Sequence, residues 1–210
     1  MPDVFGLYLV LTDPVTGYER CTEAAVAAGV RYVQLRMKEE PRPAVVAMGH
    51  RLRAVTSGTA TRFIVNDDVG IAREVDADGV HLGQDDMPLE EARRVWPLAG
   101  KIFGLSTHGE EQERRARTVR PDYIGVGPVF ATPTKERPDP TLGLRRMGEI
   151  IAASPLTTVA IGGINADNLP EVLSCGAVNF AVVRAVTQSP DPATAIRMLQ
   201  DTWRQHRRAL

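Results

Sequence analysis

The sequence has little that would place the protein outside the cell or in a membrane. It contains two cysteines, Cys21 and Cys175, and their spacing fits neither a metal site nor a redox pair. No apolar stretch approaches the length needed to span a bilayer. Residues 1–11 include a short apolar run, but no basic region precedes it and no cleavage signal follows it. We therefore expect a protein of the reducing cytoplasm that does not bind membranes.

An excess of charge of either sign is also absent. The chain has 25 lysines and arginines against 26 aspartates and glutamates, a formal net charge of −1. This balance argues against nucleic acid as a partner, because it provides no broad basic surface. Any recognition of phosphate must come from local groups of side chains. The 210 residues, 43% hydrophobic and 24% charged, are typical of one soluble domain, here residues 1–210.

Short apolar segments recur along the chain at regular intervals. They are nearly continuous in apolar residues rather than alternating, as expected for parallel strands covered on both faces. The predicted strands are Gly6–Leu11, Tyr32–Leu35, Phe63–Val65, Gly79–Leu82, Ile102–Leu105, Tyr123–Val129, Thr158–Ile161 and Asn179–Val183.

Segments with helical spacing lie between these strands. They are Glu19–Ala28, Pro43–Val55, Asp68–Glu74, Pro88–Val95, Gly109–Val119, Leu142–Ala153, Ala166–Cys175 and Ala193–Arg208. Asp191-Pro192 opens the last one with a cap residue and a proline at the first helical position. Eight strand–helix alternations predict an α/β fold, a single (β/α)₈ TIM barrel with its active site at the C-terminal ends of the strands. An open doubly wound sheet is the competing interpretation.

The second predicted strand ends in Gln34-Leu35-Arg36-Met37-Lys38. Alternation along a strand sends Gln34, Arg36 and Lys38 to one side, and Leu35 and Met37 to the other. Two cations and an amide at a barrel mouth are hard to explain as packing, because buried unpaired charge is costly. An anion bound between them would neutralise both cations. The alternative is a solvated strand end whose spacing arose by chance.

Acidic residues follow the third and fourth strands. Carboxylates on adjacent strand ends can share one hard cation, and Mg²⁺ is commonly held by one or two carboxylates with substrate phosphate completing its shell. Asp67 and Asp86 are the preferred ligands, because Asp68 could cap the following helix and Asp85 could do the same in its loop. His81 lies inside an apolar strand, which is more typical of a satisfied interior histidine than of a base.

Polar residues also follow the fifth and sixth strands. Ser106 offers a hydroxyl where a loop begins. The longest irregular stretch, Ala131–Thr141, follows the sixth strand, and a loop of this length on a barrel is usually functional. Thr132, Thr134 and Lys135 would make it a polar lid that carries a mobile cation.

The last two strands end where barrels of this architecture commonly bind phosphate. Gly162-Gly163 after the seventh strand lets backbone N–H groups approach an anion. Arg184 follows the eighth strand and adds a cation. These positions predict a second phosphate site, separate from the one at Arg36.

Together these motifs resemble those of the thiamine-phosphate synthase family. The resemblance covers nearly the whole chain and rests on seven motifs in order, which are QLRMK, VNDD, DGVHLGQDD, GLSTH, GVGPVFATPTK, AIGGIN and VVRAVT. It implies a transferase that joins a hydroxymethylpyrimidine diphosphate to a hydroxyethylthiazole phosphate, or to its carboxylated precursor. The products would be thiamine phosphate and pyrophosphate.

The resemblance also implies a role for each candidate residue. Those implied to bind the pyrimidine diphosphate are Gln34, Arg36, Lys38, Asn66, Ser106 and Lys135, with Arg36, Lys38, Ser106 and Lys135 acting in catalysis. Those implied to bind the thiazole phosphate are Thr132, Thr134, Gly163, Val183 and Arg184. Asp67 and Asp86 are the implied ligands of Mg²⁺. The expected partners are phosphorylated small molecules and no nucleic acid, and a homo-oligomer is compatible with the sequence.

The chain departs from the family at two of these motifs. Met37 stands where many relatives carry an acidic residue, but it alternates away from the mouth, so we expect little effect. Arg184 stands where many have serine; it could grip the thiazole phosphate with two hydrogen bonds or pair with a surface carboxylate.

Two other functions compete with the synthase. A related thiazole tautomerase would use a histidine at the position of His108, but would need neither Asp67 and Asp86 nor the Thr-Pro-Thr-Lys segment. A barrel that senses thiazole phosphate without turnover is the second alternative. Both are disfavoured, because every synthase ligand position is present.

Overall fold

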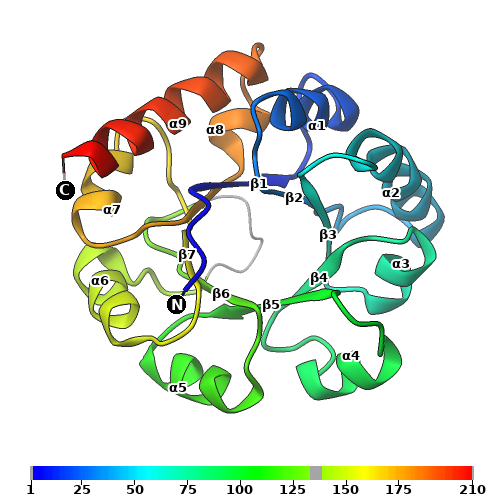
Figure 1. Ribbon diagram of the computed structural model, residues 1–210, viewed down its shortest axis with the longest axis horizontal. Coiled ribbons are helices and arrows are strands. Elements are labelled where there is room, and N and C mark those ends of the chain that lie inside the picture. The colour runs from blue at the N-terminus through cyan, green and yellow to red at the C-terminus, as the bar shows by residue number, and fades with distance from the viewer. Residues whose placement is uncertain (1, 133–138, 210) are drawn as a thin grey trace.

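Eight parallel strands close into a barrel in the computed structural model, which describes residues 2–132 and 139–209. Each strand is hydrogen-bonded to the next in sequence, and the last pairs with the first (Figure 1). The strands are β1 (Leu7–Leu11), β2 (Tyr32–Leu35), β3 (Arg62–Asn66), β4 (Gly79–Leu82), β5 (Ile102–Thr107), β6 (Tyr123–Val126), β7 (Thr158–Ile161) and β8 (Phe180–Val182). The predicted TIM barrel is therefore confirmed, and the open doubly wound sheet is excluded.

Helices form an outer ring around the strands (Figure 1). They are α1 (Tyr18–Ala27), α2 (Arg42–Thr56), α3 (Val69–Glu74), α4 (Leu89–Val95), α5 (Glu110–Val119), α6 (Gly143–Ala153), α7 (Leu169–Ser174), α8 (Arg184–Thr187) and α9 (Pro192–Arg208). As predicted, Asp191 caps α9, accepting a hydrogen bond from the Thr194 N–H at 3.1 Å. Among the described residues, no helix is both long and apolar enough to cross a membrane.

The apolar side chains form two separate layers. The larger layer fills the space between the strands and the helices, and Met37 packs against it, as alternation predicted. The smaller layer lies inside the barrel and contains Tyr8, Tyr32 and Tyr123. The segment before β1 crosses the barrel end where the strands begin, and Phe5 packs edge-on against Tyr32 with ring centroids 4.7 Å apart (Figure 1).

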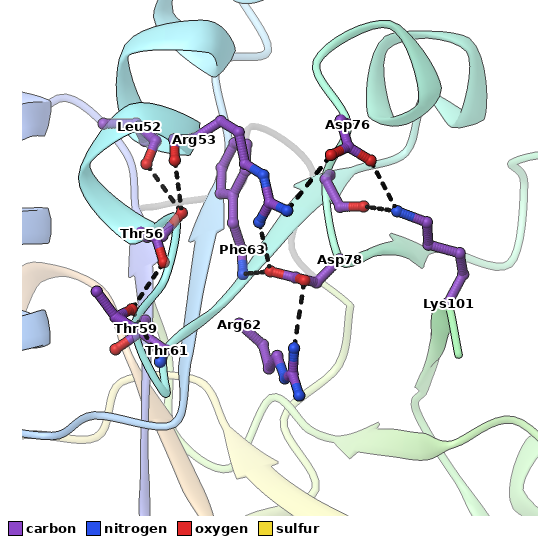
Figure 2. Close-up of polar contacts among 11 residues, drawn as sticks. Leu52, Arg53, Thr56, Thr59, Thr61, Arg62, Phe63, Asp76, Asp78 and Lys101 are labelled. Atoms are coloured by element: carbon purple, nitrogen blue, oxygen red, sulfur yellow. Dashed lines mark hydrogen bonds and ion pairs between the residues drawn. The ribbon is translucent and has the colours of Figure 1, made fainter. Parts of the chain in front are cut away.

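Polar side chains at the end where the strands begin hold neighbouring strands together. Asp78, immediately before β4, accepts a hydrogen bond from the Phe63 N–H of β3 at 2.8 Å and forms an ion pair with Arg53 at 3.0 Å (Figure 2). Asp76 lies beside this group and pairs with Lys101 at 3.0 Å. These contacts bind α2, β3, β4 and β5 at the N-terminal face of the barrel.

The same device recurs before β6 and β8. Asp122 accepts a hydrogen bond from the Phe103 N–H at 2.8 Å. The side-chain oxygen of Asn179 accepts hydrogen bonds from the N–H groups of Phe5 and Gly6 at 2.7 and 3.0 Å. Before β4, β6 and β8, an acidic or amide residue thus satisfies the backbone at the start of the neighbouring odd strand.

Two predicted boundaries were wrong by three residues and one helix was missed, each for an identifiable reason. The sixth strand was expected to reach Val129 but ends at Val126, because Pro128 has no N–H to extend the ladder. The helix expected from Ala166 begins at Leu169, because the Asn165 side chain accepts from the Asn168 N–H and forms a turn there. Helix α8 was not predicted, since four residues are too few to show a helical period.

Candidate active site

A cavity of about 320 Å³ opens at the C-terminal ends of the strands. The structure places eight predicted site residues on its wall: Gln34, Arg36, Asn66, Ser106, Thr132, Gly163, Val183 and Arg184. Lys38, Asp67 and Asp86 form a group of their own, described below. Thr134 and Lys135 lie outside the described residues.

Arg36 brings a half-buried cation to the cavity. Its guanidinium donates a hydrogen bond to the Thr12 hydroxyl at 3.4 Å, and within residues 2–132 and 139–209 it makes no ion pair with a carboxylate. Burial lowers the pKa of the guanidinium, while the more distant carboxylates of Asp67 and Asp13 raise it. A cation in this setting favours an anionic ligand, because a bound anion would supply the partner that the protein does not.

Lys38, Asp67 and Asp86 lie together beside the β3 and β4 ends. The Lys38 ammonium is 2.8 Å from an Asp67 carboxylate oxygen, and an Asp86 oxygen accepts a hydrogen bond from the Gly83 N–H at 2.6 Å. Burial raises the pKa of the Asp86 carboxyl, the adjacent Asp67 carboxyl raises it further, and the Gly83 N–H lowers it. Two carboxyl groups this close repel each other when both are ionised, and a bound cation would relieve that repulsion.

Asp67 and Asp86 could supply part of the coordination shell of a magnesium ion. Asp67 has a backbone φ of 65°, an uncommon conformation for a residue other than glycine. In the part of the chain that the structure describes, no group of three His, Cys, Asp or Glu side chains could hold a metal alone. Two carboxylates suffice for Mg²⁺ only if phosphate oxygens or waters complete the coordination.

Two of three neighbouring polar residues, Asp68 and His81, have structural roles. Asp68 accepts a hydrogen bond from the Ile71 N–H at 2.8 Å and caps α3, as the sequence suggested. Asp85 does not cap α4, because Pro88 is the residue before that helix and no side chain caps it. The His81 ring nitrogens lie 3.1 Å from the Tyr123 hydroxyl and 2.9 Å from the Ser106 hydroxyl. The prediction of a satisfied interior histidine is confirmed.

The glycines at the β7 end pack closely against the start of the β6–α6 connection. Gly162 and Gly163 have φ values of 106° and 66°, and a Cβ on Gly163 would lie 2.7 Å from the Cβ of Phe130. The side-chain amide of Asn168 donates to the Gly163 carbonyl at 2.9 Å and keeps that carbonyl engaged. Only glycine fits both the left-handed conformation and the space here.

Arg184 reaches the cavity from the first position of α8. Within the described residues it makes no ion pair, so the surface carboxylate considered as its alternative partner is not found there. Its role in binding phosphate stays a prediction.

His108 lies on the cavity wall and joins two loops. Its Nδ1 is 2.7 Å from the Gly127 carbonyl oxygen, and its Nε2 is 3.4 Å from an Asp139 carboxylate oxygen. The ring therefore connects the end of β5 to both ends of the β6–α6 connection.

Two tyrosines at the base of the cavity were not among the predicted site residues. Tyr8 and Tyr123 are 2% exposed, and their hydroxyl oxygens lie 2.8 Å apart. Both tyrosines lie within apolar runs of the sequence, which is typical of strand core. Alternation nevertheless puts Tyr8 on the same strand face as Val10, and Tyr123 on the same face as Gly125. An unexpected tyrosine at an inward position of a barrel strand was the available signal.

Comparison with known proteins identifies relatives along nearly the whole chain. A family model described as thiamine monophosphate synthase matches residues 7–186. The curated thiamine-phosphate synthase of Roseiflexus sp. strain RS-1 is 40% identical to this chain, and the match covers 94% of this chain and 85% of the relative. The curated thiamine-phosphate synthase of Archaeoglobus fulgidus is 39% identical, and the match covers 100% of this chain and 99% of the relative. A solved thiamine phosphate pyrophosphorylase from Pyrococcus furiosus superposes with a TM-score of 0.86 and 33% identity, covering 96% of both chains.

Proposed function

The chain belongs to the thiamine monophosphate synthase family, a family of transferases in thiamine biosynthesis, and from this premise we propose its reaction in detail. The substrates are 4-amino-2-methyl-5-(diphosphooxymethyl)pyrimidine and 4-methyl-5-(2-phosphooxyethyl)thiazole or its carboxylated precursor. The thiazole nitrogen displaces pyrophosphate from the pyrimidine methylene to give thiamine phosphate, and the carboxylated substrate also loses its carboxylate as CO₂.

One observation carries this proposal: two arginines without carboxylate partners in the described structure line a single cavity. Arg36 follows β2 and Arg184 follows β8, so β1 separates them. A reaction between two phosphorylated substrates requires two anion sites on one cavity. One site must hold a diphosphate that leaves, and the other must hold a monophosphate that stays with the product.

The diphosphate site lies at the ends of β2, β3 and β4. Arg36 and Lys38 offset the charge that develops on pyrophosphate as the bond to the methylene carbon breaks. Lys135 is proposed to act on the same group. Asp67 and Asp86 would hold Mg²⁺, which stabilises the charge of the leaving pyrophosphate when bound.

The cavity between the two anion sites positions the reacting groups. An aminopyrimidine is electron-rich and can support a cation at its methylene carbon, so departure of pyrophosphate can precede attack. Gln34, Asn66 and Ser106 hold the pyrimidine, while the apolar wall formed by Val159 and Ile161 limits the access of water to that carbon. Positioning then contributes most of the rate, because little proton transfer is required of the protein.

The monophosphate site lies at the ends of β7 and β8. The backbone at Gly163 and Val183 and the guanidinium of Arg184 bind the phosphate of the thiazole. Thr132 and Thr134 contact the same substrate from the β6–α6 connection.

The direct test is to incubate the protein with both substrates and Mg²⁺ and to detect thiamine phosphate and pyrophosphate by mass spectrometry. Omission of either substrate is the control, and Arg36→Met removes the cation while retaining the length of the side chain. We expect stoichiometric products with the wild type and a large loss with Arg36→Met. Isomerised thiazole phosphate without condensation, or binding without any product, would replace this proposal with one of the two alternatives.

A further inference from the structure

A chain of hydrogen bonds crosses the barrel interior beneath the cavity. It begins on β2, where the Gln34 Nε2 donates to the Tyr8 hydroxyl at 2.8 Å. The hydroxyl oxygens of Tyr8 and Tyr123 are 2.8 Å apart, and the Tyr123 hydroxyl is 3.1 Å from His81 Nδ1. It ends on β5, where His81 Nε2 lies 2.9 Å from the Ser106 hydroxyl. Its two ends are residues assigned to the pyrimidine diphosphate, and three strands contribute the links between them.

The two phenols in the middle of the chain keep their protons. Tyr8 and Tyr123 are each 2% exposed, and burial raises the pKa of both hydroxyls above the usual value. Each hydroxyl therefore has one proton to donate and lone pairs with which to accept. Because each phenol has a single proton, it can donate to only one of its two neighbours in the chain.

The Gln34 amide favours one direction of these hydrogen bonds. Its Nε2 can only donate, so the Tyr8 hydroxyl accepts there and has its own proton available for Tyr123. Tyr123 in turn donates to His81 Nδ1, which leaves the proton of a neutral imidazole on Nε2. His81 Nε2 then donates to the Ser106 oxygen, and the Ser106 proton is left to point into the cavity. Reversing the chain would require the Gln34 amide to turn its oxygen toward Tyr8.

Gly104 provides the space that the hydrogen-bond chain needs. A Cβ on Gly104 would overlap the Tyr123 hydroxyl and ring carbon and would lie 2.6 Å from His81 Nδ1. The rings of His81 and Tyr123 stack with centroids 5.5 Å apart and an interplanar angle of 19°. At Gly125, on the adjacent strand, the nearest atoms to a Cβ would be at 3.7 Å, an ordinary contact. Of these two glycines, only Gly104 therefore lies where a side chain would collide with the Tyr123–His81 hydrogen bond.

We propose that Tyr8, Tyr123 and His81 are positioning residues that orient the Ser106 hydroxyl as a hydrogen-bond donor to the pyrimidine substrate. The proposal rests on the proposed function, because the assignment of Gln34 and Ser106 to that substrate comes from it. The chain also couples the two ends, since the amide orientation of Gln34 and the donor direction of Ser106 are set together. An acceptor atom of the substrate, such as a ring nitrogen, is the group that Ser106 then recognises.

Nuclear magnetic resonance of the wild-type protein tests the direction of the chain without any variant. In a sample with ¹⁵N-labelled histidine, His81 is expected to carry its proton on Nε2 and to accept at Nδ1. A proton on Nδ1 of the neutral ring would overturn the proposal. Because this measurement does not depend on turnover, it separates failure of the chain from failure of the proposed function.

Kinetics test the consequence for the substrate. Tyr123→Phe removes one hydroxyl from the middle of the chain and keeps the ring, so kcat/KM for the pyrimidine diphosphate should fall about tenfold. The KM for the thiazole phosphate should change less than about twofold, because that substrate is bound at the β7 and β8 ends. The His81 resonances should change with the same substitution as the preference for one tautomer is lost.

Tyr32→Phe is the matched control. Tyr32 packs in the same interior layer, with its ring centroid 5.8 Å from that of Tyr123, but its hydroxyl is not a link in the chain. The Tyr32→Phe variant should keep the wild-type His81 tautomer and the wild-type kcat/KM for the pyrimidine diphosphate. Equal effects of Tyr32→Phe and Tyr123→Phe in an active enzyme would refute the proposal and would leave the proposed function intact.

Discussion

Substitution of Asp78 by alanine should destabilise the barrel and leave its activity unchanged. The carboxylate lies at the N-terminal face, where it accepts the Phe63 N–H at 2.8 Å and pairs with Arg53 at 3.0 Å (Figure 2). Phe63 is fully buried, and leaving its amide without a partner costs about 1–3 kcal/mol. The Arg53 and Asp78 side chains are 26% and 14% exposed, so their partly screened ion pair adds about 1 kcal/mol. Together these contacts predict a loss of about 3 kcal/mol.

Chemical and thermal denaturation would measure this loss. For a chain of this length each kcal/mol lowers Tm by about 2–4 °C, so Asp78→Ala should lower it by about 6–12 °C. Asp78→Asn should fall between the wild type and the alanine variant, because an amide oxygen can still accept from the backbone, as Asn179 does for Phe5. The kcat/KM of all folded variants should match the wild type, since active sites of this architecture lie at the opposite face.

Asp76→Asn is the control for charge alone. Asp76 pairs with Lys101 at 3.0 Å and with Arg53 at 3.4 Å, but its side chain is 74% exposed, so the loss should stay below about 1 kcal/mol. Asparagine also tolerates the φ of 50° at this position. If Asp78→Ala were no less stable than Asp76→Asn, the backbone hydrogen bond would not contribute as reasoned. Lower activity in folded Asp78→Ala would contradict the separation of the two faces.

Further predictions concern the cavity. Asp67→Asn should raise the Mg²⁺ concentration for half-maximal activity at least about tenfold, and an unchanged Mg²⁺ titration would remove Asp67 from the metal site. Arg184→Ala should raise the KM for the thiazole phosphate about tenfold and more than that for the pyrimidine diphosphate; equal effects on both would contradict the two-site assignment. Gly104→Ala should cost about 1–3 kcal/mol by denaturation because the added methyl overlaps Tyr123. Gly125→Ala, with its ordinary contacts, should cost clearly less, and equal losses would show that the interior adjusts freely.

The barrel could be predicted from the sequence because its signal is local and repeated. Each buried parallel strand is a continuous apolar run, and each helix has its own period, so eight repetitions compensate for errors at individual boundaries. The errors arose where backbone chemistry overrides the apolar pattern, as at Pro128 and at the Asn165 turn. Helix α8 was missed because four residues cover about one helical turn, so no periodic repeat can be seen in them.

The candidate site could be predicted in part because the ends of parallel strands meet at one face. That rule places Gln34, Asn66 and Ser106 around the same space without any knowledge of distances. The rule does not predict the ion pair between Lys38 and Asp67 at 2.8 Å, because that contact depends on how two loops fold. The rule also does not predict the contact between the hydroxyls of Tyr8 and Tyr123, which are 115 positions apart in the sequence.

The two ends of the barrel differ in how their charged groups are satisfied, and this difference connects stability to function. At the N-terminal face, Asp78 and Asp122 are engaged by backbone N–H groups of neighbouring strands. At the C-terminal face, Arg36 and Arg184 line the cavity without carboxylate partners within the described residues. A chain with a net charge of −1 has enough carboxylates to pair these arginines, so the composition does not force them to stay unpaired. Their exclusion from ion pairs keeps the cavity receptive to anions, while the opposite face contributes the stability that such a site requires.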